Sequence, residues 1–174
     1  GGNESSGSAS INADGVVSLV LGSVDIGGTR ASIAMQLAET LGIAYEDVQP
    51  KIVDTDSVGF TGNTGGSRTT FAGGWVAYDL GMQIRAQMCA RAARIWECTP
   101  DEVTYGDDGV IRGPKDAEGK ERSFTFKQLG RYAGFGVGGA VLLGIGVALL
   151  GVGGLRALQT ETGETFTGDW SWAP

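Results

Sequence analysis

Short hydrophobic runs alternate with glycine-rich turns at the start of the chain. Residues 8–11 alternate polar with apolar side chains, and residues 16–21 are rich in β-branched and aliphatic ones. The turn signal between them is Asn12-Ala13-Asp14-Gly15. This order predicts a β-hairpin.

A helix is expected directly after a glycine-rich turn at residues 22–29. Apolar residues recur at helical spacing over residues 33–41 and form one stripe. Gly42 follows, and glycine commonly ends a helix because it adopts the left-handed conformation without strain. Residues 49–54 predict a second strand, which leads into a long loop over residues 55–68.

The rest of the chain predicts a long helix, a hairpin and a short helix. The long helix is expected within residues 72–97, the hairpin over 103–112 and the short helix near 127–129, after a polar loop. On the long helix the buried side is expected to carry Ile84, Met88, Ala92 and Ile95. Strands and helices interleave with hairpins, which predicts an α+β fold or a mixed α/β one.

The apolar stretch 133–155 has no charged residue and is long enough to cross a membrane. Glycines argue against a membrane-spanning helix, because each glycine in a helix interior costs about 1 kcal/mol. Packing in the protein core is the favoured interpretation, either as a buried glycine-rich helix or as a segment similar to a later helix of the family named below. We therefore expect two parts, residues 1–130 as an α+β segment and residues 131–174 as a glycine-rich apolar helix with a polar tail. Both are expected to pack in the same domain.

Composition narrows the chemistry. The net charge of −7 argues against a nucleic-acid partner, which needs a basic face. Histidine is absent, so neither a histidine-dependent catalytic triad nor a histidine metal site is possible within this chain.

The two cysteines, Cys89 and Cys98, are expected to be buried, reduced thiols of a cytoplasmic protein. No basic, apolar leader is visible at the N-terminus. No catalytic residue and no metal ligand is assigned. The tryptophans are expected in the core: Trp75, Trp96, Trp170 and Trp172.

Two glycine-rich loops each precede a predicted helix. Amides at a helix start are unpaired and the helix dipole is positive there, so both loops are candidates for binding an anion. The first is Gly27-Gly28-Thr29-Arg30, and the second is Gly65-Gly66-Ser67-Arg68-Thr69-Thr70. The second combines hydroxyls with a guanidinium and is the better phosphate cradle. Ordinary helix capping is the alternative for either loop.

Three carboxylates follow predicted strands, namely Asp25, Asp54 and Asp56. Acid–base or metal chemistry is one interpretation. A role in capping helices and holding turns is favoured, because aspartate commonly accepts hydrogen bonds from nearby backbone amides.

The order of the motifs GSVDIG, AETLGI, EDV, DT and GSRTT over residues 14–84 closely resembles the large subunits of the xanthine dehydrogenase, aldehyde oxidase and carbon monoxide dehydrogenase family. The resemblance extends over about residues 8–130. It implies a fold like part of the second molybdenum-binding domain, and a molybdopterin cofactor in the cytosine dinucleotide form. The implied cofactor-binding residues are Gly27, Gly28, Thr29, Gly66, Ser67, Arg68, Thr69 and Thr70.

The chain departs from this family in three ways. Gly28 stands where many relatives have a glutamine that contacts the pterin, and Gly139 stands where the family's GVGE motif would place its catalytic glutamate. Family enzymes are also several times longer.

The resemblance implies that iron–sulfur and flavin groups lie on partner subunits only, and that other segments or subunits complete the enzyme. We expect the chain alone to be inactive. The alternative is a non-catalytic assembly module that binds a partner through its apolar tail.

Overall fold

A computed structural model describes residues 4–52, 54, 56–134 and 141–143. Most of the apolar stretch 133–155 lies outside these residues, as do Trp170, Trp172 and the segment with Gly139. The interpretations of that stretch, as a membrane span or as part of the core, therefore concern residues that the structure does not describe. No helix among the described residues combines the length and the apolar character that a membrane span requires.

A four-stranded sheet forms the base of the fold, in the order β3-β2-β1-β7. The predicted hairpin is confirmed: β1 (Gly7–Ile11) and β2 (Val17–Leu21) pair antiparallel. The predicted second strand is β3 (Val48–Ile52), which runs parallel to β2. Where a helix is expected after residue 130, the short strand β7 (Val141–Leu143) instead pairs antiparallel with β1.

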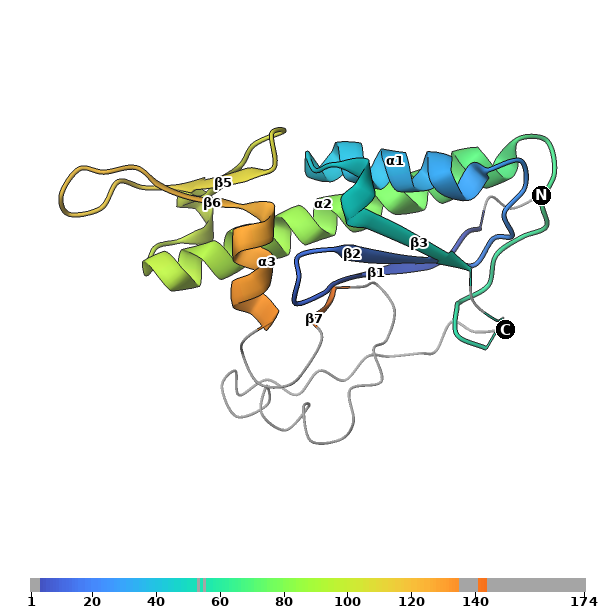
Figure 1. Cartoon of the computed structure of the whole chain (residues 1–174), viewed down its shortest axis with the longest axis horizontal. Coiled ribbons are helices and arrows are strands. Elements are labelled where there is room, and N and C mark those ends of the chain that lie inside the picture. Colours follow the sequence, from blue (N-terminus) through green and yellow to red (C-terminus); the bar gives the residue numbers. More distant parts are fainter. Residues whose placement is uncertain (1–3, 53, 55, 135–140, 144–174) are drawn as a thin grey trace, which may run out of the picture.

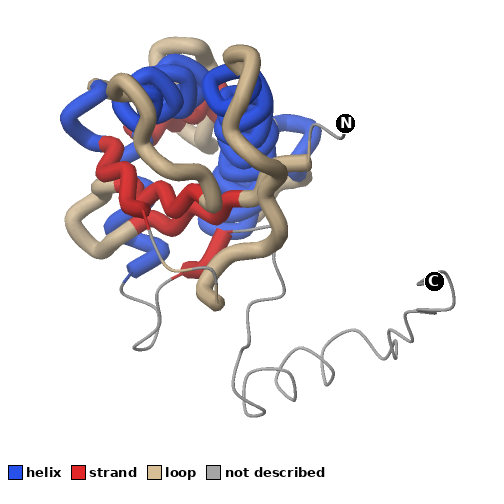
Figure 2. Tube along the Cα trace, turned by 90° about the vertical axis from the view of Figure 1, so that its right-hand side faces the viewer, coloured by secondary structure: helices blue, strands red, loops and turns tan. Residues whose placement is uncertain are grey.

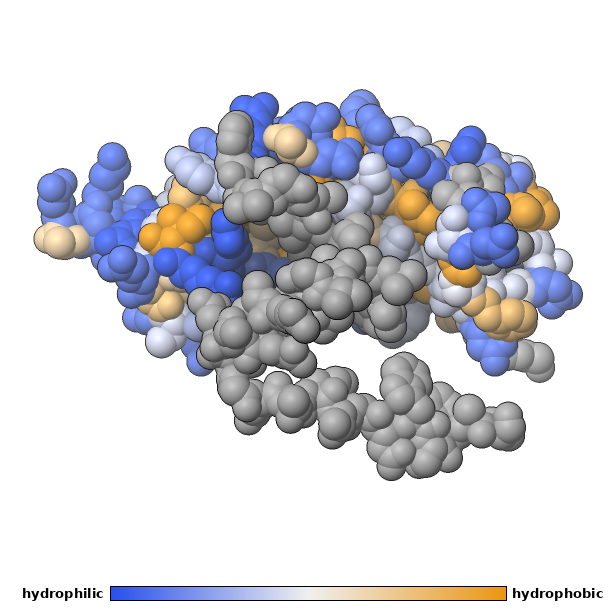
Figure 3. All heavy atoms as spheres, turned by 90° about the horizontal axis from the view of Figure 1, so that it is seen from below, coloured by the Kyte–Doolittle hydropathy of each residue, from blue (hydrophilic) through white to orange (hydrophobic). Residues whose placement is uncertain are grey.

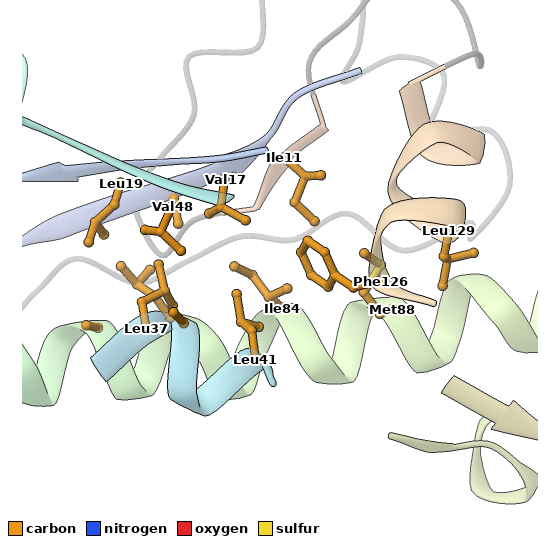
Figure 4. Packing of buried hydrophobic residues seen from close by; sticks show 14 of the residues in the cluster. Ile11, Val17, Leu19, Leu37, Leu41, Val48, Ile84, Met88, Phe126 and Leu129 are labelled. Carbon is orange, nitrogen blue, oxygen red and sulfur yellow. The ribbon is translucent and has the colours of Figure 1, made fainter. Parts of the chain in front are cut away.

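Two helices cover one face of this sheet (Figure 1 and Figure 2). They are α1 (Thr29–Leu41), which ends at left-handed Gly42 as predicted, and the long α2 (Arg68–Trp96). Both helices start at the same end of the molecule and run side by side. Their apolar sides meet the sheet in one core, in which Leu19, Leu37 and Ile84 are fully buried (Figure 4).

A smaller three-stranded antiparallel sheet packs at the far end of α2. Its strands are β4 (Thr104–Tyr105), β5 (Val110–Gly113) and β6 (Arg122–Thr125), and α3 (Phe126–Gly134) follows directly. The chain also forms two short 3-10 helices, η1 (Tyr45–Asp47) and η2 (Pro100–Glu102). The predicted hairpin is confirmed, whereas β6 was not expected as a strand. Seen from below, polar residues cover the end that carries the β5–β6 loop (Figure 3).

Three expectations about burial are wrong. Cys89 and Cys98 are half-buried against the core rather than fully buried. Ile95 is 39% exposed, because the last turn of α2 directs Ala93 and Trp96, not Ile95, toward the core. Trp75 is 68% exposed and lies outside the core, whereas Trp96 packs against the core and stacks on Phe124 with ring centroids 5.0 Å apart. Helical spacing identifies an apolar stripe but does not reveal which neighbour covers it.

Candidate functional site

The carboxyl ends of the two parallel strands meet at one edge of the main sheet. The loop after β2 leads into α1, and the loop after β3 leads into α2, so both helices begin at this edge (Figure 1). In sheets with parallel strands, ligands commonly bind at such an edge, because the loops and helix starts gather there. The two glycine-rich loops singled out in the sequence are therefore neighbours in space.

Each of these loops ends in the same backbone turn. Thr29 N donates to Ile26 O at 3.1 Å across Gly27 and Gly28, whose φ angles are 60° and 79°. Two successive residues with positive φ make a type I′ turn, which glycine adopts without strain. The first helix of the main layer thus starts from a left-handed turn.

The second loop repeats this turn with a serine in it. Arg68 N donates to Gly65 O at 3.0 Å across Gly66 and Ser67, whose φ angles are 56° and 61°. A left-handed conformation is uncommon for a residue with a side chain and costs roughly 1–2 kcal/mol. The hydroxyl of Ser67 does not cap α2, so it is not used to stabilise the helix start.

A cavity of about 250 Å³ lies between the two turns, and we call it the cradle. Its lining residues come from both loops: Ile26, Thr29, Thr64, Gly65, Gly66, Ser67, Arg68, Thr69 and Thr70. Six of the eight residues predicted from the sequence line it, and the two that do not are Gly27 and Gly28. Gly65 belongs to the second loop predicted to bind an anion, whereas Ile26 and Thr64 were not predicted as ligand contacts. The only sequence signal for Ile26 and Thr64 was that each lies next to a glycine-rich turn.

The two helix starts differ in how many of their amides are free. At α1, Asp25 Oδ1 accepts from Arg30 N at 3.0 Å, and the Asp25 carboxylate also pairs with the Arg30 guanidinium at 3.4 Å. At α2, the amides of Thr69 and Thr70 have no acceptor among the described residues. The α2 start therefore offers unpaired donors to an anion, whereas the α1 start already has a carboxylate.

Side chains in the second loop have distinct tasks. The Arg68 guanidinium donates to the carbonyl of Gly62 at 3.0 Å and also to the carbonyl of Glu4. It therefore ties the loop to the N-terminal segment, a role that the sequence did not suggest. The buried Thr69 hydroxyl lies 3.3 Å from that of Thr64. At the first turn, Thr29 Oγ1 accepts from Ile26 N at 3.2 Å and keeps its own proton to donate.

Two of the three carboxylates that follow the strands, Asp25 and Asp54, accept hydrogen bonds from nearby amides, as favoured from the sequence. Asp54 Oδ1 accepts from the amide of Asp56 at 3.0 Å and from the hydroxyl of Ser57 at 2.9 Å. The bond from Ser57 is the main reason that the pKa of Asp54 lies below its ordinary value. Among the described residues, no three acidic or cysteine side chains gather where they could hold a metal ion.

Comparison with known families accounts for this arrangement. The profile of the molybdopterin cofactor-binding domain matches residues 1–142. The chain belongs to this family. The expectation drawn from the GSVDIG and GSRTT motifs is thereby confirmed at the level of the family and of its α+β fold.

Solved structures of longer enzyme chains share the fold of this molybdopterin cofactor-binding domain. A reconstituted CO dehydrogenase from Oligotropha carboxidovorans is 25% identical with a TM-score of 0.64, and a Cu,Mo-CO dehydrogenase in the carbon monoxide reduced state is 24% identical with a TM-score of 0.65. Both alignments cover 74% of this chain. Quinoline 2-oxidoreductase from Pseudomonas putida 86 is 18% identical with a TM-score of 0.56 over 75% of this chain. The domain spans 16% of each of these longer chains. Comparison with curated protein sequences gives no significant match.

The cradle fits the phosphate-bearing end of a molybdopterin. It combines unpaired amides of α2 with hydroxyls from Thr29 and Ser67, and these are the donors that a phosphate accepts from. A Cβ atom at Gly65 or Gly66 would meet no atom within 4 Å, so the wall there is open to a ligand. The chemistry of the residues and the family assignment therefore agree.

Proposed function

We propose that this domain supplies one wall of the molybdopterin site in a molybdenum-dependent hydroxylase. The observation that supports the proposal is the cradle, where two left-handed turns and two helix starts converge on one cavity. The cofactor is proposed to be molybdopterin in its cytosine dinucleotide form. The negative charge of its pyrophosphate would be attracted to the unpaired amides at the start of α2. When bound, such a cofactor supplies the molybdenum centre that transfers oxygen from water to the substrate.

Within this proposal each loop has its own contribution. Gly66, Ser67, Thr69 and Thr70 hold phosphate oxygens through amides and hydroxyls, and Arg68 keeps their loop in place through the Gly62 and Glu4 carbonyls. Thr29 lies on the opposite wall of the cavity. Gly27 and Gly28 form the turn directly before it, where the chain can approach a ligand closely because no side chain intervenes. The α2 side contributes most of the binding, since its amides are unpaired.

The catalytic step is proposed to need further polypeptide. None of the residues that line the cradle carries a carboxylate. We therefore assign no general base for the reaction among them. Other segments or subunits would supply the remaining walls, and iron–sulfur and flavin groups on partner subunits would accept the electrons. We propose a cytoplasmic complex, in keeping with the two free thiols of Cys89 and Cys98.

Gly65→Leu tests the cradle without disturbing the turn. Gly65 lacks a positive φ and has open space at its Cβ position, so a leucine fits the backbone while filling the cavity. We expect the complex that contains this variant to lose most of its pterin and molybdenum, measured as pterin fluorescence after acid release and as metal content per chain.

Ala86→Leu is the matched control, because Ala86 is exposed on α2 far from the cradle. It should keep full cofactor. Thermal unfolding of both variants shows whether the fold is intact. Normal pterin content in a folded Gly65→Leu complex would refute the assignment of the cradle.

A further inference from the structure

The first half of helix α2 is apolar on two faces, of which only one meets the core. Ala77, Leu80 and Ile84 line its buried face. A second stripe repeats at spacings of four, three and four residues on the exposed side. It consists of Phe71 (70% exposed), Trp75 (68%), Tyr78 (46%) and Met82 (42%). A helix that is apolar on both faces is typical of a helix covered on both sides.

The neighbouring helix α1 extends this surface. Met35 is 58% exposed and lines an open cavity of about 550 Å³ together with Tyr78. Trp75 and Tyr78 contact each other with ring centroids 5.5 Å apart. We call the surface formed by Met35, Phe71, Trp75, Tyr78 and Met82 the aromatic face. Clustered apolar side chains of this size on one surface mark an interaction site more often than isolated ones do.

The aromatic face is continuous with the cradle. A cavity of about 540 Å³ beside Phe71 and Trp75 is also lined by Ser67 and Thr70, which line the cradle itself. A body that covers the aromatic face therefore reaches the open side of the cofactor site. Because a small ligand does not cover so long a surface, a protein surface is the fitting occupant.

We propose that the aromatic face docks the remaining part of the molybdenum subunit, and that this contact closes the cradle over the cofactor. The inference rests on the proposed function. Its main support is length: the domain spans 16% of each related chain, so most of such a subunit lies outside it. The docking surface on the partner is apolar with a rim of lysine or arginine, because the exposed Glu39 and Asp79 border the cavities on this face.

A second copy of this chain is a poorer occupant. Pairing two aromatic faces about a two-fold axis brings the same residues together from both copies. Glu39 and Asp79 would then face an equally acidic surface, in a chain whose net charge is −7. Like charges across an interface oppose association, so a partner of the opposite charge is favoured.

Site-specific photocrosslinking in cells that naturally express the protein tests the docking. A p-benzoyl-phenylalanine in place of Trp75 is expected to crosslink to a polypeptide that mass spectrometry identifies by molybdenum-hydroxylase sequence. The same group in place of Tyr132, which is 58% exposed on α3, is the control and should give no such product. A product with a second copy of this chain, with an unrelated protein or with nothing at position 75 overturns the proposal.

Trp75→Glu provides a second measurement, because it adds a charge where the partner is apolar. We expect it to abolish co-purification of the identified polypeptide, while circular dichroism shows an unchanged fold. Pterin content separates the two proposals. Crosslinking at position 75 without pterin in the complex would refute the proposed function alone. Pterin that depends on Gly65 but no crosslink at position 75 would refute the docking alone.

Discussion

Arg85 on α2 fixes the β4–β5 hairpin to the main layer through Tyr105. The Cζ atom of Arg85 lies 4.7 Å from the centroid of the Tyr105 ring, and its guanidinium donates to the Tyr105 carbonyl at 2.8 Å. The Tyr105 hydroxyl in turn donates to the carbonyl of Leu41 at 2.8 Å. Arg85 also donates to the Thr40 carbonyl at 3.2 Å, so two residues join α2, the end of α1 and the small sheet.

Arg85→Ala should therefore destabilise the domain as a whole. The Arg85 side chain is 20% exposed, and its loss leaves the carbonyls of Thr40 and Tyr105 without this donor. Hydrogen bonds to charged groups contribute about 1.5–3 kcal/mol, so we expect a loss of about 2 kcal/mol in urea unfolding. Arg91→Ala on the exposed side of the same helix should change stability little. Equal losses for the two variants would contradict this role.

The close contact of α1 with α2 predicts a cost for even one added methyl group. A Cβ atom at Gly81 would lie 2.5 Å from Cγ2 of Thr40, which is too close for any unshifted neighbour. Gly81→Ala should lower the free energy of unfolding by about 1–3 kcal/mol, although alanine favours helices.

Thr40→Ser in the same chain should restore part of that loss. It removes Cγ2 but keeps the hydroxyl that donates to the Gln36 carbonyl at 2.7 Å. A double-mutant cycle measured by urea unfolding isolates the coupling between Gly81 and Thr40. Additive effects of the two substitutions would show that the steric contact is not the cause.

The elements that follow local patterns are those that the sequence predicted well. Periodicity over residues 33–41 and the following Gly42 give α1 and its end, since both signals lie within the helix itself. The hairpin of β1 and β2 likewise depends on a turn signal between two short strands. The burial of Trp75 and Ile95 was predicted wrongly because burial does not depend on a local pattern. It depends on which distant element covers a side chain.

The candidate site could be foreseen only in part for the same reason. The glycine loops were visible as motifs, but their meeting depends on the parallel pairing of β2 with β3, which no local signal specifies. The left-handed conformation of Ser67 was equally hidden, because serine does not favour it. Arg68 looked like an anion ligand, yet its partner carbonyl on Glu4 comes from a segment far away in the chain.

The small sheet carries an ion pair whose pH dependence can be measured directly. The Arg112 guanidinium donates to Asp108 Oδ2 at 2.5 Å and is the main reason that the pKa of Asp108 is lowered to about 2. A lowered pKa means that the contact stabilises the fold above the ordinary carboxyl value of 3.8 and is lost as pH falls through about 2.

Arg112→Gln should raise the Asp108 titration midpoint toward 3.8, because the strongest donor is removed. Carboxyl carbon NMR over pH 1.5–6 follows that single group. The Val110 amide still donates to Asp108 at 3.2 Å in the variant, so a small downward shift should persist. An unchanged midpoint would mean that the ion pair is absent in solution.

The final prediction concerns Gly28, which the resemblance places where many relatives have glutamine. A Cβ atom at Gly28 meets nothing within 4 Å, so a glutamine side chain has room beside the cradle. Its φ of 79° makes any side chain cost about 1–2 kcal/mol of stability. If the amide reaches the cofactor, one added hydrogen bond of about 0.5–1.5 kcal/mol should tighten its retention about 2- to 10-fold.

Gly119→Gln is the matched control for that measurement. Gly119 also has a positive φ, 80°, with nothing within 4 Å of its Cβ position, but it lies in the β5–β6 loop far from the cradle. Both variants should therefore lose similar stability in thermal unfolding, and only Gly28→Gln should slow pterin loss during dialysis of the complex. Because the backbone cost is matched, slower loss in Gly28→Gln alone would show that the first turn faces the cofactor. Equal rates in the two variants would confine binding to the α2 side, where the unpaired amides of Thr69 and Thr70 lie.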